Sequence, residues 1–349
     1  MKKKLIIALA VLLLLISGCS TSNNNEESQE QPSSSPDKQE TPVDNEETET
    51  DKAQQEEKIT APKETLQKKD EGKNVTSLQN ALREIGYKLS EDGVYEEATT
   101  WAITDLQLQF EKLQATGVYN KATQNVLSSL LEDAETDFQP GKALPKQAET
   151  TMTSHGTPVL SNPYDQLAIV NKEFALPADY VPEDLVTPNV RFPFTEDLPK
   201  KQMRQVAADH LEELFAAADE AGLDLYAQSG FRSYDRQDAI FASNAAEHGE
   251  EAANNFSARP GESEHQTGLA MDVTSPEVNF QLNTDFGETD EGKWVEEHAA
   301  EYGFIIRYPK GKETITQYQY EPWHLRYVGE ETAKEMMKEG ITLEEYFAE

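Results

Sequence analysis

Hydrophobic residues are patterned in two parts of this chain, and the first part predicts helices. From Val75, apolar residues recur at helical spacing until Gly86. A second run at the same spacing comprises Trp101, Ile103, Leu106 and Phe110. The sequence Gly-Val-Tyr-Glu-Glu-Ala-Thr at 93–99 returns as Gly-Val-Tyr-Asn-Lys-Ala-Thr at 117–123. Because each copy places a glycine turn before a helix, we expect a three-helix unit over residues 75–132.

The second part, residues 159–349, predicts a larger domain in which short strands and helices are mixed. We expect strands at 167–172, 223–227 and 304–308, one leading into Asp272, and one from Glu321. We expect helices at 200–221, after the capping residue Ser233, at 294–302 and at 330–340.

Two polar stretches separate these parts from each other and from the N-terminus. Residues 20–74 consist mainly of Glu, Gln, Ser, Asn, Thr and Pro, with almost no large apolar side chain. Such a composition cannot offset the entropy of ordering, which predicts a disordered acidic tether. Residues 133–158 are polar and carry three prolines, which predicts a linker.

The N-terminus has the pattern of an export signal over residues 1–19. Three lysines precede the apolar run 5–16, which is too short for a comfortable membrane span, and Ser-Gly-Cys follows at 17–19. The segment resembles the bacterial lipobox, which implies a lipid on Cys19 and anchoring to the outer face of the cytoplasmic membrane of a Gram-positive-like bacterium. Cys19 is the only cysteine, so no intrachain disulfide can form.

Charge excludes one class of partner. The net charge of −34 repels phosphate backbones, so we expect no nucleic acid to bind.

The candidate chemistry lies in two short stretches of the larger domain. Residues 263–272, Ser-Glu-His-Gln-Thr-Gly-Leu-Ala-Met-Asp, supply His265 and Asp272, and Glu-Pro-Trp-His at 321–324 supplies Glu321 and His324. Two imidazoles and one carboxylate suit a catalytic zinc ion and leave a position open for water. The remaining carboxylate, Glu321, is then the candidate general base.

The helical unit resembles the peptidoglycan-binding domain 1 family. The resemblance rests on Leu78-Gln79, Gly86-Tyr87, Asp92-Gly93, Thr99, Thr116-Gly117 and Thr123, and the chain departs from the family pattern at Glu96 and Leu106. It implies binding to the wall glycan. The alternative is a helical spacer that binds no ligand.

The larger domain resembles the VanY-type D-alanyl-D-alanine carboxypeptidases of the M15 metallopeptidase family, in their M15B-like branch. The matching motifs are Ser229-Gly230-Phe231-Arg232-Ser233, Ser263-x-His265-x-x-Gly268-x-Ala270-x-Asp272, Glu321-x-Trp323-His324 and Gly303–Pro309. The resemblance implies an α+β zinc peptidase domain with a small antiparallel sheet and flanking helices, of the hedgehog/DD-peptidase kind. It also implies that Zn²⁺ is held by His265, Asp272 and His324, with Glu321 as catalytic acid/base and Arg232 as the cation of the substrate site. Ser263 and Gln237 are further candidates for substrate contact.

Two functions of different classes follow. The first is a zinc-dependent carboxypeptidase that removes the C-terminal D-Ala from peptidoglycan stem peptides, with an L,D-carboxypeptidase or a peptidoglycan endopeptidase as alternatives. The second is a non-catalytic wall-binding lipoprotein with a structural zinc. The presence of Glu321 and Arg232 favours the enzyme, because a structural zinc is usually closed by four ligands and needs neither residue.

The N-terminal pattern generates one prediction. Replacing the only thiol, Cys19→Ala, should release the protein from the membrane fraction or leave it unprocessed, because the lipid would have no attachment site. Fractionation and gel migration of the variant measure this. A variant that behaves like the wild type in both would contradict lipidation at Cys19.

Overall fold

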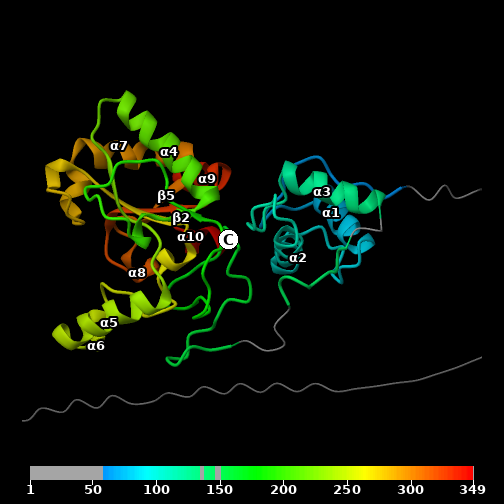
Figure 1. The fold of residues 1–349 in the computed structure, drawn as a ribbon, viewed down its shortest axis with the longest axis horizontal. Coiled ribbons are helices and arrows are strands. Elements are labelled where there is room, and N and C mark those ends of the chain that lie inside the picture. The colour runs from blue at the N-terminus through cyan, green and yellow to red at the C-terminus, as the bar shows by residue number, and fades with distance from the viewer. Residues whose placement is uncertain (1–57, 134–136, 146–150, 349) are drawn as a thin grey trace, which may run out of the picture. The chain divides into compact units, whose positions relative to one another are not determined.

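The structure, a computed structural model, describes residues 58–133, 137–145 and 151–348, which are coloured from blue to red in Figure 1. The predicted export signal with its lipidation residue Cys19, and most of the predicted tether, lie outside the described residues. No helix within the described ranges is long and apolar enough to span a bilayer.

Three helices form the first folded unit, as the repeat predicted (Figure 1). They are α1 (Lys73–Glu84), α2 (Glu97–Leu108) and α3 (Lys121–Glu132). The side chain of Asn120 caps α3 by accepting a hydrogen bond from the backbone N–H of Thr123. Fully buried apolar side chains from the three helices meet in one core: Leu78, Leu82, Ile103, Leu106 and Leu127. Burial of each such side chain contributes about 1.5–3 kcal/mol, so the core holds the helices together.

The helical unit begins before the boundary predicted at residue 75. Leu66 is buried and exchanges two backbone hydrogen bonds with Tyr119, and Glu71 forms a bridge with Val94. Val94 and Tyr119 belong to the two copies of the internal repeat. The stretch before α1 therefore pairs with both repeats. The sequence pattern did not predict this pairing, because backbone hydrogen bonds rather than a row of apolar side chains hold the stretch in place.

Part of the predicted linker is also bound to the helical unit. Asp105 on α2 is fully buried, and its carboxylate accepts hydrogen bonds from the backbone N–H groups of Gly141, Ala143 and Leu144 at 2.7–3.0 Å. The hydroxyl of Tyr87 donates to the same carboxylate at 2.7 Å. One buried acid thus orders a polar segment that has few apolar residues of its own.

The larger domain contains a four-stranded antiparallel sheet in the order β3-β4-β6-β5. Its strands are β3 (Tyr226–Ser229), β4 (Ala270–Thr274), β5 (Phe304–Tyr308) and β6 (Glu321–Tyr327). A two-stranded sheet joins β1 (Leu185–Val186) to β2 (Met203–Arg204). The helices are α4 (Gln205–Glu220), α5 (Tyr234–His248), α6 (Glu250–Ala253), α7 (Asp290–His298), α8 (Glu313–Thr316), α9 (Glu330–Glu339) and α10 (Leu343–Ala348). Short 3-10 turns include η1 (Pro199–Lys201) and η2 (Glu264–Thr267). The predicted fold class, a small antiparallel sheet with flanking helices, is confirmed.

The two faces of the sheet differ in chemistry. Alternate strand residues enter the main hydrophobic core with residues of α4 and α7: Met271, Val273, Trp323, Leu325, Phe304, Leu211, Leu214, Phe215 and Val295. The intervening strand residues belong to the other face, because successive side chains alternate. They include four charged or titratable residues, Asp272, His324, Arg326 and Arg307, and all four are buried. One face therefore stabilises the domain and the other gathers its polar groups.

Two expected elements differ from the structure. Residues 167–172 form irregular coil between two turns rather than a strand. The Asp165 carboxylate accepts from the N–H of Leu167, and the Asn171 side chain accepts from the N–H of Glu173, which favours turns at both ends. The helix expected from residue 200 begins only at Gln205. The residues before it are used elsewhere: the carbonyl of Gln202 accepts from the N–H of Phe231 at 2.6 Å.

The buried acid of α2 gives a prediction. In Asp105→Ala the three N–H donors of segment 137–145 lose their acceptor, which should lower the free energy of unfolding of the helical unit by about 1–3 kcal/mol. Hydrogen exchange across 137–145 and thermal unfolding measure this.

Asp105→Asn, which keeps one carbonyl acceptor, is the matched control and should fall between the wild type and Asp105→Ala. Unchanged exchange of segment 137–145 in Asp105→Ala would show that the carboxylate does not order it.

Candidate metal centre and active site

The register of two strands brings Asp272 and His324 together. Strands β4 and β6 are antiparallel, and Asp272 lies directly opposite His324 in the pairing. Directly opposed side chains of an antiparallel pair are close enough to interact. Nδ1 of His324 lies 3.1 Å from Oδ1 of Asp272. Both residues are about 97% buried, at 3% exposure each.

His265 reaches the same point from η2, the turn that precedes β4. Its Nε2 lies 3.4 Å from Oδ2 of Asp272. The turn ends at Gly268, whose φ of 70° lies in the left-handed region that favours glycine, and a Cβ there would meet the Arg204 side chain at 2.8 Å. The chain can therefore reverse tightly from η2 into β4 only with glycine at this position.

Each histidine presents a different nitrogen to the centre. Nδ1 of His265 lies 2.8 Å from the carbonyl oxygen of Gly230, and because that oxygen can only accept, Nδ1 carries the proton and Nε2 is free. Gly230 is closely packed, and any larger residue would clash there, because a Cβ on it would lie 2.3 Å from the Gln202 carbonyl oxygen. His324 instead turns Nδ1 toward Asp272.

The donor set fits a metal ion. One donor atom from each of His265, Asp272 and His324 lies within 4.8 Å of the others. Among the described residues, this is the only group of three or more His, Cys, Asp or Glu side chains whose donor atoms lie this close together. Oδ1 of Asp272 is buried and accepts no well-formed hydrogen bond from the described residues, although Nδ1 of His324 lies 3.1 Å away. A buried carboxylate oxygen without a donor is costly, and a bound cation would satisfy it.

The charges around the centre shift its pKa values. Burial, together with the Arg232 charge, lowers the pKa of His265 to about 3. Burial also disfavours a charged His324, but contacts with Asp272 and Glu264 outweigh it and raise the pKa of His324 to about 9. The pKa of Asp272 lies below its ordinary value, because the neighbouring histidines and Arg232 outweigh the effect of burial. The carboxylate is thus ionised, as a ligand must be.

Glu321 lies beside the donor set although strand alternation would direct it away. It differs from His324 by three positions, yet its Oε2 lies 4.0 Å from His324 Nδ1. The pairing of β5 with β6 is irregular between Tyr308↔Glu321 and Ile306↔Leu325, and Pro322 in this segment has no N–H for the ladder. Such a bulge re-aims a side chain. Burial raises the pKa of Glu321 to about 7.

Arg232 completes the constellation from the loop after β3. Its backbone N–H donates to the carbonyl of His265 at 3.2 Å, and its Nη1 donates to Oε1 of Gln237 at 2.9 Å. Burial lowers the pKa of Arg232, while Asp272 and Glu321 raise it. The guanidinium therefore interacts electrostatically with the Asp272 and Glu321 carboxylates of the centre.

The two candidates for substrate contact lie at the edge of this arrangement. The Gln237 amide is engaged with the protein at both ends, since its Nε2 donates to the Ala258 carbonyl at 2.6 Å while its Oε1 accepts from Arg232. Gln237 therefore orients Arg232. Ser263 is buried at 5% exposure and immediately precedes η2.

Sequence reasoning missed Glu264, the residue between Ser263 and His265. It is 1% exposed, and its Oε2 lies 3.5 Å from Nε2 of His324. Burial raises the pKa of Glu264, but Arg307 and Arg326 reverse this and lower it below the ordinary value. Only its position next to a histidine could have drawn attention to it, because its arginine partners are distant in sequence.

Fold and site together define a metallopeptidase domain that follows a small helical domain along the chain. Comparisons with known protein families agree with this description. The family model of VanY, D-alanyl-D-alanine carboxypeptidase, matches residues 200–330, and that of a provisionally assigned peptidoglycan binding domain matches residues 71–127.

Relatives and one solved structure extend this likeness. The chain is 54% identical over 192 residues to YodJ of Bacillus subtilis, which is provisionally named a carboxypeptidase. This match covers 55% of the present chain and 70% of YodJ. The chain is 31% identical over 221 residues to a D-alanyl-D-alanine carboxypeptidase of Enterococcus faecalis, covering 56% and 76% of the two chains. The structure of the LdcB LD-carboxypeptidase matches with a TM-score of 0.56 and 52% identity, over 57% of this chain and 93% of LdcB. The chain belongs to the VanY carboxypeptidase family.

Proposed function

We propose that this protein is a zinc-dependent D-alanyl-D-alanine carboxypeptidase that removes the C-terminal D-Ala from peptidoglycan stem peptides. The observation that carries the proposal is the convergence of three buried donors, His265, Asp272 and His324, with Glu321 and Arg232 beside them. A structural metal site would need neither of the last two. The family match over residues 200–330 supports the same reaction class.

His265, Asp272 and His324 would hold the zinc ion. When bound in such a site, zinc polarises the scissile carbonyl and lowers the pKa of water to about 7. Glu321 accepts a proton from the attacking water and returns it to the leaving amine. Arg232 presents a fixed fork of N–H donors to negative charge, either the terminal carboxylate of the substrate or the developing oxyanion. Gln237 holds that fork in place.

An L,D-carboxypeptidase is the second candidate, and the likeness to LdcB favours it. Such an enzyme cuts the bond before a single terminal D-Ala. A peptidoglycan endopeptidase of the same family would instead cut between stem peptides. All three reactions use the same groups in the same roles.

The helical domain fits the same setting. We propose that it binds wall glycan and that a lipid on Cys19 holds the protein at the outer face of the membrane. The match to a peptidoglycan-binding family over residues 71–127 supports a location outside the cytoplasm and at the wall.

The bond cut is decided by mass spectrometry of stem peptides incubated with residues 20–349. A pentapeptide ending in D-Ala-D-Ala should lose one D-Ala and stop at the tetrapeptide. Conversion of a tetrapeptide to a tripeptide would assign the L,D reaction, and cleavage of cross-linked dimers the endopeptidase. No product from any substrate by zinc-loaded protein would contradict an enzyme and favour a non-catalytic wall-binding protein with a structural zinc.

Replacing Glu321 distinguishes a catalytic metal site from a structural one. Glu321→Gln keeps the shape of the side chain but cannot accept a proton, so metal content should match that of the wild type. Its kcat on a D-Ala-D-Ala peptide should fall by about 10²–10⁴-fold, the contribution of general acid–base catalysis.

The matched control is Glu339→Gln at the exposed end of α9, which should leave kcat unchanged. Loss of metal in Glu321→Gln would make Glu321 a ligand, and an unchanged kcat would exclude it as the base.

A further inference from the structure

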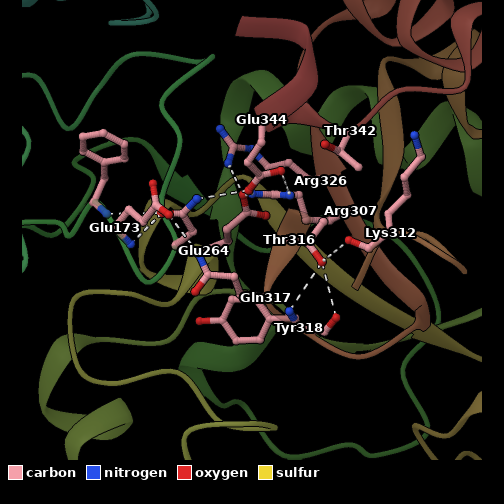
Figure 2. A network of polar contacts seen from close by, with 12 residues as sticks. Glu173, Glu264, Arg307, Lys312, Thr316, Gln317, Tyr318, Arg326, Thr342 and Glu344 are labelled. Carbon is pink, nitrogen blue, oxygen red and sulfur yellow. Dashed lines mark hydrogen bonds and ion pairs between the residues drawn. The ribbon is translucent and has the colours of Figure 1, made fainter. Parts of the chain in front are cut away.

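Figure 2 shows a network of polar contacts that includes Glu264, Arg307 and Arg326. These three residues are buried, and Glu264 lies beside His324 of the metal centre. At the middle of this network is Glu264, whose Oε1 accepts from Nε of Arg307 and from Nη1 of Arg326, both at 2.7 Å. Arg307 and Arg326 are fully buried. Both arginines lie on the same sheet face as His324, because they occupy alternate positions of β5 and β6.

The network leaves one carboxylate oxygen unused. Oε2 of Glu264 is buried and has no hydrogen-bond partner among the residues that the structure describes. The same is true of Nε2 of His324, and these two atoms lie 3.5 Å apart. An acceptor and a ring nitrogen, each otherwise unsatisfied, therefore face each other on the side of His324 that is remote from Asp272.

We propose that Glu264 is the positioning carboxylate of the metal centre: it accepts the Nε2 proton of His324 and so keeps the Nδ1 lone pair directed at the metal. The inference rests on the proposed metal site. Metal-binding histidines commonly donate their second nitrogen to a carboxylate or carbonyl, which selects the tautomer and holds the ring. Here His265 uses the Gly230 carbonyl for this purpose and His324 uses Glu264.

The arginines explain why a carboxylate can occupy this place. An isolated buried carboxylate is costly, but two guanidinium groups on Oε1 compensate it. Nη2 of Arg326 donates to the carbonyls of Gln166 and Ala168, and its Nε donates to the carbonyl of Tyr327. Arg307 also pairs with Glu344. With Oε1 held by both arginines, Oε2 lies 3.5 Å from Nε2 of His324. The guanidinium groups thus act on the metal centre through Glu264.

The two histidines should consequently adopt opposite tautomers, which nitrogen-15 NMR of the histidine rings can measure. In the zinc-loaded wild type, His324 should be protonated on Nε2 and His265 on Nδ1. The chain has six histidines, so single His→Gln variants of the other four can assign the signals. Protonation of His324 on Nδ1 would overturn the proposal, even if no Glu264 variant folds.

Glu264→Gln tests the same contact through metal affinity. Replacing a partner of this kind typically costs about 10–100-fold in metal affinity, and we expect a loss in that range, measured by competition with a chromophoric chelator. A cobalt-loaded sample should also show an altered visible spectrum, since the ring of His324 is no longer held.

The matched control is Glu344→Gln, which removes the other carboxylate of Arg307 without touching His324. It should lower thermal stability as Glu264→Gln does, but leave zinc affinity within about threefold of the wild type. Equal losses of affinity in both variants would reduce Glu264 to a structural role and overturn the proposal.

Because none of these measurements uses peptide hydrolysis, a failure of the enzymatic proposal would remain separate. A wild type that binds no divalent metal would overturn the metal site and this inference together.

Discussion

The antiparallel register of β4 and β6 is the constraint on which the site depends. Opposite pairing of Asp272 and His324 puts two donors side by side on one sheet face. A slip of β6 by one residue would turn His324 into the hydrophobic core and bring Leu325 out of it, so that Asp272 would lose its partner. The apolar core on the other face therefore fixes the geometry of the polar face, and stability and chemistry come from the same hydrogen-bonded ladder.

Burying so many charged groups costs free energy unless each group has a partner of opposite charge, and the domain provides such partners around each buried carboxylate. Asp272 is surrounded by two histidines and Arg232, and Glu264 by two arginines. Removing one partner from such a set leaves an uncompensated buried charge, which is far more costly than losing a surface pair. The same partners limit where each side chain can point. A site held in this way would need little rearrangement to bind a metal ion.

The loop between β3 and α5 contributes two groups to the candidate metal centre. Gly230 orients His265 through its carbonyl, and two residues later Arg232 presents its guanidinium to the same centre. Ser233 then caps α5 by accepting from the N–H of Arg236. Residues within one short loop thus orient a candidate metal ligand, supply a cation and cap a helix, which explains why a short motif carries so much of the resemblance to the family.

Sequence alone determined the two domains, the helices and strands that carry strong periodicity, and the identity of the chemical groups, because these depend on local spacing and residue type. Tertiary structure alone decided the boundary near Leu66 and the order imposed by Asp105, since backbone hydrogen bonds leave no hydrophobic pattern. It also decided which nitrogen of each histidine faces the centre and how a strand irregularity aims Glu321. Glu264 belongs here too: its partners Arg307 and Arg326 come from other strands, and only their pairing on one sheet face brings the three charges together.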